Sequence, residues 1–171
     1  LIIFFWVDNQ LYVSKTISPT EDVSTYITQS WTNYTQAGQA HQEHRHHNSM
    51  ISGVFYVQAV EQRDNVLFHK PGVDELPMKI VPKEYNIFNS NSWEYIVTTG
   101  QLYLFPSHLS HGVPEVGAGA GSKMPTAKDQ DGNYIQGSTR ISLSFNTWCE
   151  GIVGINNNLD ELVLEKSNQY E

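Results

Sequence analysis

Four of the chain's seven histidines lie within the seven-residue segment HQEHRHH, residues 41–47. Neutral imidazole is a good ligand for transition metals, so this cluster suggests a metal site. Two residues separated by one position in an extended segment point to the same side, because side chains alternate along a strand. His44 and His46 form one such chelating pair, and His41 with Glu43 forms another. The residue types alone leave both pairs open.

A third ligand is expected from the segment LYLFPSHLSHGV, residues 102–113, where an apolar run is followed by His108 and His111 in a loop. Imidazole suits iron, zinc, copper and nickel, so the ligands do not choose the metal. A single histidine is more often an ordinary polar residue, but this degree of clustering favours a metal. His47, His69 and His108 are interpreted as surface or supporting residues.

A polar stripe is predicted on the segment RISLSFN, residues 140–146. Three apolar residues alternate there with Arg140, Ser142, Ser144 and Asn146, so one strand face is polar. A guanidinium inside a barrel requires an anionic partner, and its fork matches a carboxylate. Ser142 can add a hydroxyl to the same anion. The alternative is a structural salt bridge between Arg140 and an Asp or Glu of this chain.

The elements that must position these residues are mostly short strands, rich in β-branched and aromatic residues and separated by turn signals. Many short strands with regular turns predict a β-sandwich or barrel. Helical patterns are scarce, and we expect them only at Ser18–Gln29 and at residues 158–166. The expected strands are Ile2–Val7, Leu11–Lys15, Ile51–Ala59, Val66–His69, Met78–Val81, Glu94–Thr98, Leu102–Phe105, Arg140–Asn146 and Gly151–Ile155.

The glycine-rich segment at residues 115–138 separates two predicted strands. No helix follows its GxGxG pattern, so a nucleotide-binding loop is not indicated. We expect a flexible loop insertion, placed where it could act as a lid. The whole of residues 1–171 is predicted to be one domain. Because it starts with Leu1 rather than Met, we expect it to be truncated at its N-terminus.

Charge and composition restrict the partners. The formal net charge of −8 argues against nucleic acid, which requires a basic surface. The single cysteine, Cys149, rules out an internal disulfide and favours a reducing cytoplasm. The apolar start LIIFFWV is too short to span a membrane. The expected partner is therefore a small-molecule or peptide substrate, and the sequence gives no indication of oligomeric state.

Taken in order, the motifs HRHHNSMISGVFYV, GQLYLFPSHLSHGV and RISLSFN resemble a family of 2-oxoglutarate- and Fe(II)-dependent oxygenases of bacteria and phages. That family is itself similar to the prolyl-hydroxylase branch of the superfamily. Its pattern has an HxH pair before an SGVYY-type strand, an FPSxLxH segment and an RxSxSFN strand. The segment SWTNYTQAG resembles the strand before the HxH pair, so the likeness runs from about Trp31 to Asn146.

The resemblance implies a double-stranded β-helix, a jelly-roll barrel in an all-β chain with a few short helices. It also implies a metal site made by His44, His46 and His111. The cofactors implied are Fe(II) and 2-oxoglutarate, the latter held by Tyr56, Arg140 and Ser142. The expected activity is that of a dioxygenase that hydroxylates an unidentified substrate, either a peptidyl side chain or a small molecule. The candidates for the cavity wall are Trp31, Trp93, Phe105 and Trp148, although aromatic residues in a barrel are more often core.

Two features depart from the superfamily's usual pattern. His46 stands where a carboxylate is usual, so the ligand set has one negative charge fewer. Arg140 lies 29 residues after His111, a long interval that the insertion at residues 115–138 explains if it loops out.

Two other functions remain open. A cupin-type metalloenzyme would use three histidines without 2-oxoglutarate, but the RxS strand would then have no anion to hold. A non-catalytic jelly-roll module, structural or ligand-binding, would carry a structural metal or none.

Overall fold

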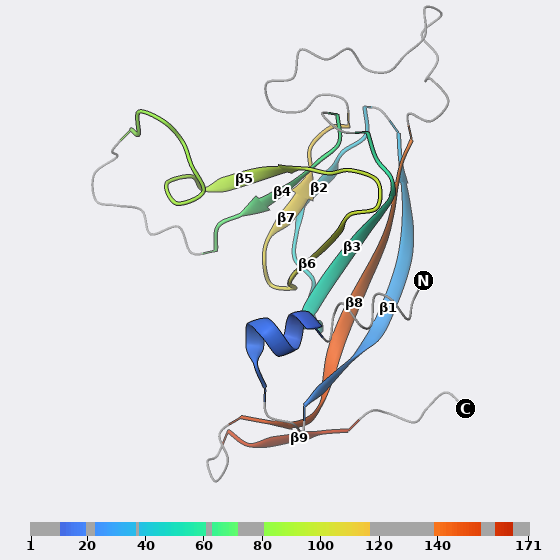
Figure 1. Ribbon diagram of the computed structural model, residues 1–171, viewed down its shortest axis with the longest axis vertical. Helices are drawn as coiled ribbons and strands as arrows, with labels where there is room; N and C mark the ends of the chain where they lie inside the picture. Colours follow the sequence, from blue (N-terminus) through green and yellow to red (C-terminus); the bar gives the residue numbers. More distant parts are fainter. Residues whose placement is uncertain are drawn as a thin grey trace, which may run out of the picture.

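The computed structural model of the protein describes residues 11–19, 23–36, 38–60, 63–71, 81–116, 139–154 and 160–165, and these are mostly antiparallel strands (Figure 1). Within these ranges one short π-helix, η1 (Val13–Ile17), precedes the strands. The strands are β1 (Ser24–Thr35), β2 (His41–His44), β3 (Ile51–Gln58), β4 (Asn65–His69), β5 (Ser92–Ile96), β6 (Leu102–Pro106), β7 (His111–Val113), β8 (Arg140–Val153) and β9 (Leu162–Leu164).

The strands form two sheets. The larger has the order β1-β8-β3-β6, with β9 paired to the far end of β8. The smaller has the order β2-β7-β4-β5. Strands that are distant in sequence are neighbours in both sheets, as a jelly roll requires. The predicted double-stranded β-helix is therefore confirmed.

Strand β8 is central to the larger sheet, with β1 on one side and β3 on the other. The register pairs Tyr56 of β3 with Ser142 of β8, and Ser52 with Asn146. Paired residues share a sheet face, so the polar stripe of β8 and alternate residues of β3 face the same way.

The smaller sheet brings two histidines together from separate segments. His44 of β2 lies directly opposite His111 of β7, while Phe68 of β4 pairs with His111 on its other side. The β2–β7 register shifts between His41 and His44, which marks a bulge.

The apolar core is formed by residues from both sheets. Its buried cluster consists of Val54, Tyr56, Val66, Val97 and Phe105. These residues come from both sheets, so burying them holds the two layers together.

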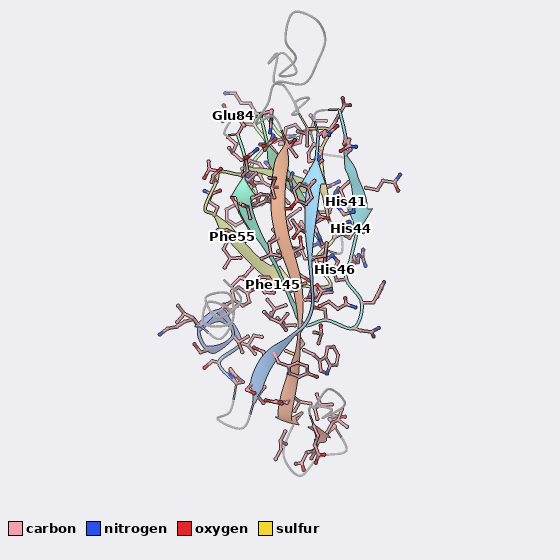
Figure 2. All side chains as sticks on the ribbon, turned by 90° about the vertical axis from the view of Figure 1, so that its right-hand side faces the viewer. His41, His44, His46, Phe55, Glu84 and Phe145 are labelled. Carbon is pink, nitrogen blue, oxygen red and sulfur yellow. The ribbon has the colours of Figure 1, made fainter. Side chains whose placement is uncertain are left out.

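Gly53 sets the packing on the other face of the larger sheet. A Cβ added there would lie 2.2 Å from Phe145 Cζ, the end of a side chain that is only 1% exposed. The ring of Phe145 therefore occupies the space above Gly53, and any larger residue at position 53 would displace it. Figure 2 shows Phe145 on β8.

Three predictions of secondary structure are wrong. Residues 11–17 are helical, not a strand; η1 satisfies its own backbone and buries Val13. Residues 24–29 belong to β1 rather than a helix, because they pair with β8. In the predicted C-terminal helix, Leu162–Leu164 form β9 against the far end of β8. In the last two cases strand pairing overrides the local pattern.

Several predictions concern residues outside the described ranges. These are the strand Ile2–Val7, residues 20–22 of the predicted helix Ser18–Gln29, residues 78–80 of the strand Met78–Val81, residues 117–138 of the loop insertion, residue 155 of the strand Gly151–Ile155, and residues 158–159 and 166 of the predicted C-terminal helix. Among the helices that the structure describes, none is long and apolar enough to cross a membrane.

Candidate active site

A cavity of about 50 Å³, open to solvent at its mouth, lies between the two sheets. It is lined by all six residues that the sequence suggested for metal and cosubstrate binding, namely His44, His46, His111, Tyr56, Arg140 and Ser142. Figure 2 shows His41, His44 and His46 following one another along one side of the barrel.

Three histidines form a cluster at one end of this cavity. His44, His46 and His111 each offer one nitrogen, and these nitrogens all lie within 4.8 Å of one another. The ring centroids are 4.4 Å apart for His44 and His111, 5.0 Å for His46 and His111, and 5.2 Å for His44 and His46. Three imidazoles at this separation are typical of a site for a divalent transition metal.

Hydrogen bonds on the far sides of the rings orient all three. His44 Nδ1 donates to the Gln42 carbonyl oxygen (2.8 Å) and His111 Nδ1 to the Leu109 carbonyl oxygen (2.9 Å). His46 Nδ1 donates to the side-chain oxygen of Asn146 at 2.6 Å. When Nδ1 carries the proton, Nε2 keeps its lone pair for a metal.

Burial keeps two of the rings neutral, as metal binding requires. Desolvation lowers the pKa of His111 from 6.5 to about 4, and its ring packs against Phe105 at a centroid distance of 4.6 Å. Desolvation likewise lowers the pKa of His46. These two nitrogens are therefore available to a cation at neutral pH.

The competing pair, His41 with Glu43, is not assembled. The bulge in β2 turns His41 into the cavity, where its ring lies 4.5 Å from that of His44. The Glu43 carboxylate instead accepts a hydrogen bond from Ser110 (2.5 Å) and lies 3.5 Å from His69 Nε2. His41, the fourth histidine of the cavity, therefore faces inward because of this bulge, which the alternation of side chains alone does not predict.

Arg140 occupies the cavity at the other end of the polar stripe and is only 4% exposed. Its Nη1 donates to the Asn65 carbonyl oxygen at 3.0 Å, and its Nη2 to the Tyr56 hydroxyl at 3.5 Å. Its Nε has no hydrogen-bond partner among the described residues. A buried guanidinium with a free donor is suited to an anionic ligand.

The predicted alternative, a structural salt bridge, does not occur within the described part of the chain. The buried carboxylate of Asp64 is held by its neighbour Arg63, with Nε to Oδ1 at 2.8 Å and Nη2 to Oδ2 at 2.7 Å. No described carboxylate lies within 4.0 Å of Arg140. The positive charge of Arg140 is therefore uncompensated by these residues, which is costly without a bound anion.

Tyr56 and Ser142 complete this end of the cavity. Tyr56 is fully buried, and desolvation raises the pKa of its phenol to about 12, so the hydroxyl keeps its proton. Ser142 is 2% exposed and lies opposite Tyr56 in the sheet. Two hydroxyls and a guanidinium thus converge, a donor set that fits a carboxylate.

The walls of the cavity agree only partly with expectation. Trp31 and Phe105 line it, while Trp93 and Trp148 do not. Sequence reasoning missed Asn33 and Thr35, which also line it. Their alternation with Trp31 along β1 was the available signal, but it was hidden by the mistaken helix at its start.

A family model described as "Putative 2OG-Fe(II) oxygenase" matches residues 29–123 of the chain. No curated protein sequence matches the chain. The matched segment contains the three clustered histidines and Tyr56, while Arg140 and Ser142 lie beyond its end.

One solved structure shares the fold with a TM-score above 0.5, and two others are similar below that level, all at low sequence identity. An oxidoreductase of the 2OG-Fe(II) oxygenase family from Burkholderia pseudomallei has a TM-score of 0.52 at 10% identity, over 81% of this chain and 50% of its own. AviO1 from Streptomyces viridochromogenes Tue57 has a TM-score of 0.47 at 11% identity, over 82% of this chain and 56% of its own. A prolyl-4-hydroxylase from Pseudomonas putida has a TM-score of 0.40 at 16% identity, over 82% of this chain and 60% of its own. This chain therefore spans only half to three fifths of their lengths.

Proposed function

The chain belongs to this family of 2OG-Fe(II) oxygenases, whose cofactors are Fe(II) and 2-oxoglutarate, and on that premise we propose that it is a dioxygenase that hydroxylates a small-molecule or peptide substrate. The proposal assigns the metal to His44, His46 and His111. It assigns the distal carboxylate of 2-oxoglutarate to Arg140, Tyr56 and Ser142.

One observation carries the proposal: the cavity that holds the three histidines also holds a buried guanidinium with no described carboxylate partner. A site that bound only a metal would have no need of Arg140. A cosubstrate that chelates the metal at one end and carries a carboxylate at the other supplies the missing anion. This favours the oxygenase over the cupin-type alternative.

The donor set fits Fe(II). Imidazole is a borderline ligand that suits iron, and three Nε2 atoms leave room for further ligands around the metal. When bound, the iron and 2-oxoglutarate supply the oxidative chemistry, in which oxygen hydroxylates a C–H bond while 2-oxoglutarate becomes succinate and carbon dioxide. The role of the protein is to hold, orient and shield these groups.

Arg140 and Tyr56 orient the cosubstrate in this proposal. The Tyr56 oxygen accepts from Arg140 Nη2 at 3.5 Å, so its own proton is free to be donated to a carboxylate. Because its pKa is about 12, that proton is retained at physiological pH. The free Nε of Arg140 adds a charged donor.

Apolar side chains exclude water from the cavity floor. Val54 and Phe105 are buried and line the cavity beside the polar groups. Low local polarity strengthens the interactions of both the cation and the anion sites.

A reducing compartment, such as the cytoplasm, suits this function. Fe(II) must be kept reduced, and the chain's one cysteine, Cys149, is buried and free.

The test is an anaerobic titration of the purified protein with Fe(II), followed by 2-oxoglutarate, monitored by visible absorption. Chelation of 2-oxoglutarate by protein-bound Fe(II) produces a metal-to-ligand charge-transfer band, and we expect this band to saturate at one equivalent of each. Fe(II) binding without the band would favour the cupin-type enzyme. Binding of neither would favour the non-catalytic module.

A further inference from the structure

The three clustered histidines differ in how their orientation is fixed. His44 and His111 donate to backbone carbonyls two residues earlier, Gln42 and Leu109, so their own loops hold them. His46 donates to a side chain 100 positions away, that of Asn146. Resting on the function proposed above, we propose that Asn146, backed by a buried chain of serine hydroxyls, is the positioning residue that makes His46 a metal ligand.

Asn146 is well placed for this task. It is 7% exposed, and its Oδ1 lies 2.6 Å from His46 Nδ1. The same oxygen accepts from Ser52 Oγ at 2.8 Å, while its Nδ2 donates to Gln29 Oε1 at 3.4 Å. The partners on both sides fix which way the amide points.

Two further hydroxyls support this contact. Ser107 Oγ lies 2.8 Å from Ser52 Oγ, and Ser49 Oγ lies 2.6 Å from Ser107 Oγ. Ser52 and Ser107 are fully buried. Ser49 Oγ also donates to the Ile51 carbonyl oxygen at 3.2 Å, so the chain that ends at Asn146 is Ser107 donating to Ser52 and Ser52 donating to Asn146. Both donors then point toward one amide oxygen, which strengthens it as an acceptor.

This arrangement selects one tautomer of His46. Asn146 Oδ1 at 2.6 Å and Ser52 Oγ at 2.9 Å both lie beside His46 Nδ1, and the Ser52 proton is donated to Asn146 Oδ1. With the proton on Nε2, the Nδ1 lone pair would face the Asn146 oxygen, an unfavourable contact between two acceptors. With the proton on Nδ1, the same distance is a strong hydrogen bond. The amide therefore keeps Nε2 unprotonated and directed toward His44 and His111.

The position of His46 explains the need for this support. The superfamily's usual ligand there is a carboxylate, whose two oxygens are equivalent and require no choice of tautomer. An imidazole binds only through an unprotonated nitrogen pointing at the metal. A neutral histidine at this place thus requires an acceptor behind it, which Asn146 supplies.

The first test measures tautomers without any metal. Long-range ¹H–¹⁵N spectra of the metal-free protein distinguish Nδ1–H from Nε2–H histidines. We expect His46 to be Nδ1–H in the wild type and a mixture in Asn146→Leu. His44 and His111 should keep Nδ1–H in both proteins, because backbone carbonyls hold them. An Nε2–H tautomer of His46 in the wild type would overturn the proposal.

The second test measures affinity for Co(II), a spectroscopic substitute for Fe(II), by d–d absorption. We expect Asn146→Leu to weaken binding by about 10- to 100-fold, the usual loss when a ligand's supporting residue is removed. Asn146→Asp should restore binding, because it keeps the acceptor oxygen. Ser107→Ala keeps the backbone bond from His46 N–H to the Ser107 carbonyl and removes only a hydroxyl that is not bonded to the His46 ring, so it should give a smaller loss in the same direction.

Thr147→Val is the matched control. Thr147 neighbours Asn146, is also buried, and donates its hydroxyl proton to the Ile51 carbonyl oxygen rather than to the serine chain. It should lose stability but retain Co(II) affinity. Equal losses of Co(II) affinity in Thr147→Val and Asn146→Leu would show that Asn146 has only a structural role. Because the tautomer test needs no metal, a protein that bound no metal would refute the proposed function but still test Asn146.

Discussion

The two ends of the cavity are prepared in opposite ways. At the histidine end, each ring nitrogen that faces away from the cavity already has an acceptor, so that lone pairs are left pointing inward. At the arginine end, the guanidinium is buried and one of its donors has no partner among the described residues. One end therefore offers acceptors to a cation, and the other offers donors to an anion. A ligand that satisfies both must carry a carboxylate at a fixed distance from a metal-binding group.

The largest effect is expected at the histidine end. His111→Ala should abolish specific Fe(II) binding, because only two of the three clustered nitrogens remain. His108→Ala is the control, since His108 is exposed and does not line the cavity. Equilibrium dialysis with Fe(II) under anaerobic conditions measures both. Equal losses in the two variants would show that His111 is not a ligand.

At the arginine end, Arg140→Leu should leave Fe(II) binding intact. It should weaken 2-oxoglutarate binding by about 3 kcal/mol or more, because a buried carboxylate would lose its charged partner. Titration of the Fe(II)-loaded protein, followed by the charge-transfer band, measures the loss. Arg45→Leu removes an exposed cation and should have little effect. Unchanged affinity in Arg140→Leu would point to the cupin-type enzyme.

Acidification should distinguish the ends further, since histidine titrates in this range and arginine does not. The pKa of His111 is about 4 in the folded protein, against 6.5 as its ordinary value. On acidification below 6.5 the unfolded chain therefore takes up the proton first, and the free energy of unfolding falls. Between pH 7 and pH 5, His111 should lower the free energy of unfolding by about 2 kcal/mol. His46 should act in the same direction.

Urea unfolding of the metal-free protein at both pH values measures this loss. The loss should shrink in His111→Leu and persist in Arg140→Leu. An equal loss in both variants would show that His111 is not its source. Above pH 6.5 the contribution from His111 should be flat.

The smallest effects separate the two candidate chelating pairs of the sequence, His44 with His46 and His41 with Glu43. His46→Asp should keep metal binding, because a carboxylate can occupy the same coordination position. Glu43→Gln should change little, because its carboxylate lies with Ser110 and His69 rather than with the cluster. Co(II) titration measures the metal affinity of both variants. Loss of binding in Glu43→Gln, together with its survival in His46→Ala, would contradict the assignment of His46.

The correct site predictions follow from the alternation of side chains along a strand. The polar face of residues 140–146 is correct, because β8 is a regular strand at that point, and its residues Arg140, Ser142 and Ser144 line the cavity. His41 was paired with Glu43 in the prediction but lies in the cavity beside His44, because a bulge changes the alternation between His41 and His44. A bulge is set by the partner strand β7, which lies about seventy residues further along the chain. Local sequence carries little trace of it.

Two of the three wrong elements have a common cause. Residues 24–29 and 162–164 belong to segments whose local pattern suggested helices, yet both pair with β8. Their state is decided by the edges of a long central strand rather than by their own periodicity. The serine and asparagine contacts behind His46 were equally hidden, since Ser107 and Asn146 are separated from it by 61 and 100 positions.

Strand β8 carries Arg140 at one end of the cavity and, six residues or about 20 Å further along the strand, Asn146, which bonds His46 at the histidine end. Adding one residue between them would turn one end outward, so insertions could enter only in pairs, in steps of about 6.6 Å. A step of this size is much larger than the length that one methylene group adds to a ligand. The backbone thus fixes the length of the bound dicarboxylate in large increments, and discrimination between neighbouring homologues must come from side-chain size at positions such as Val54 and Ser142.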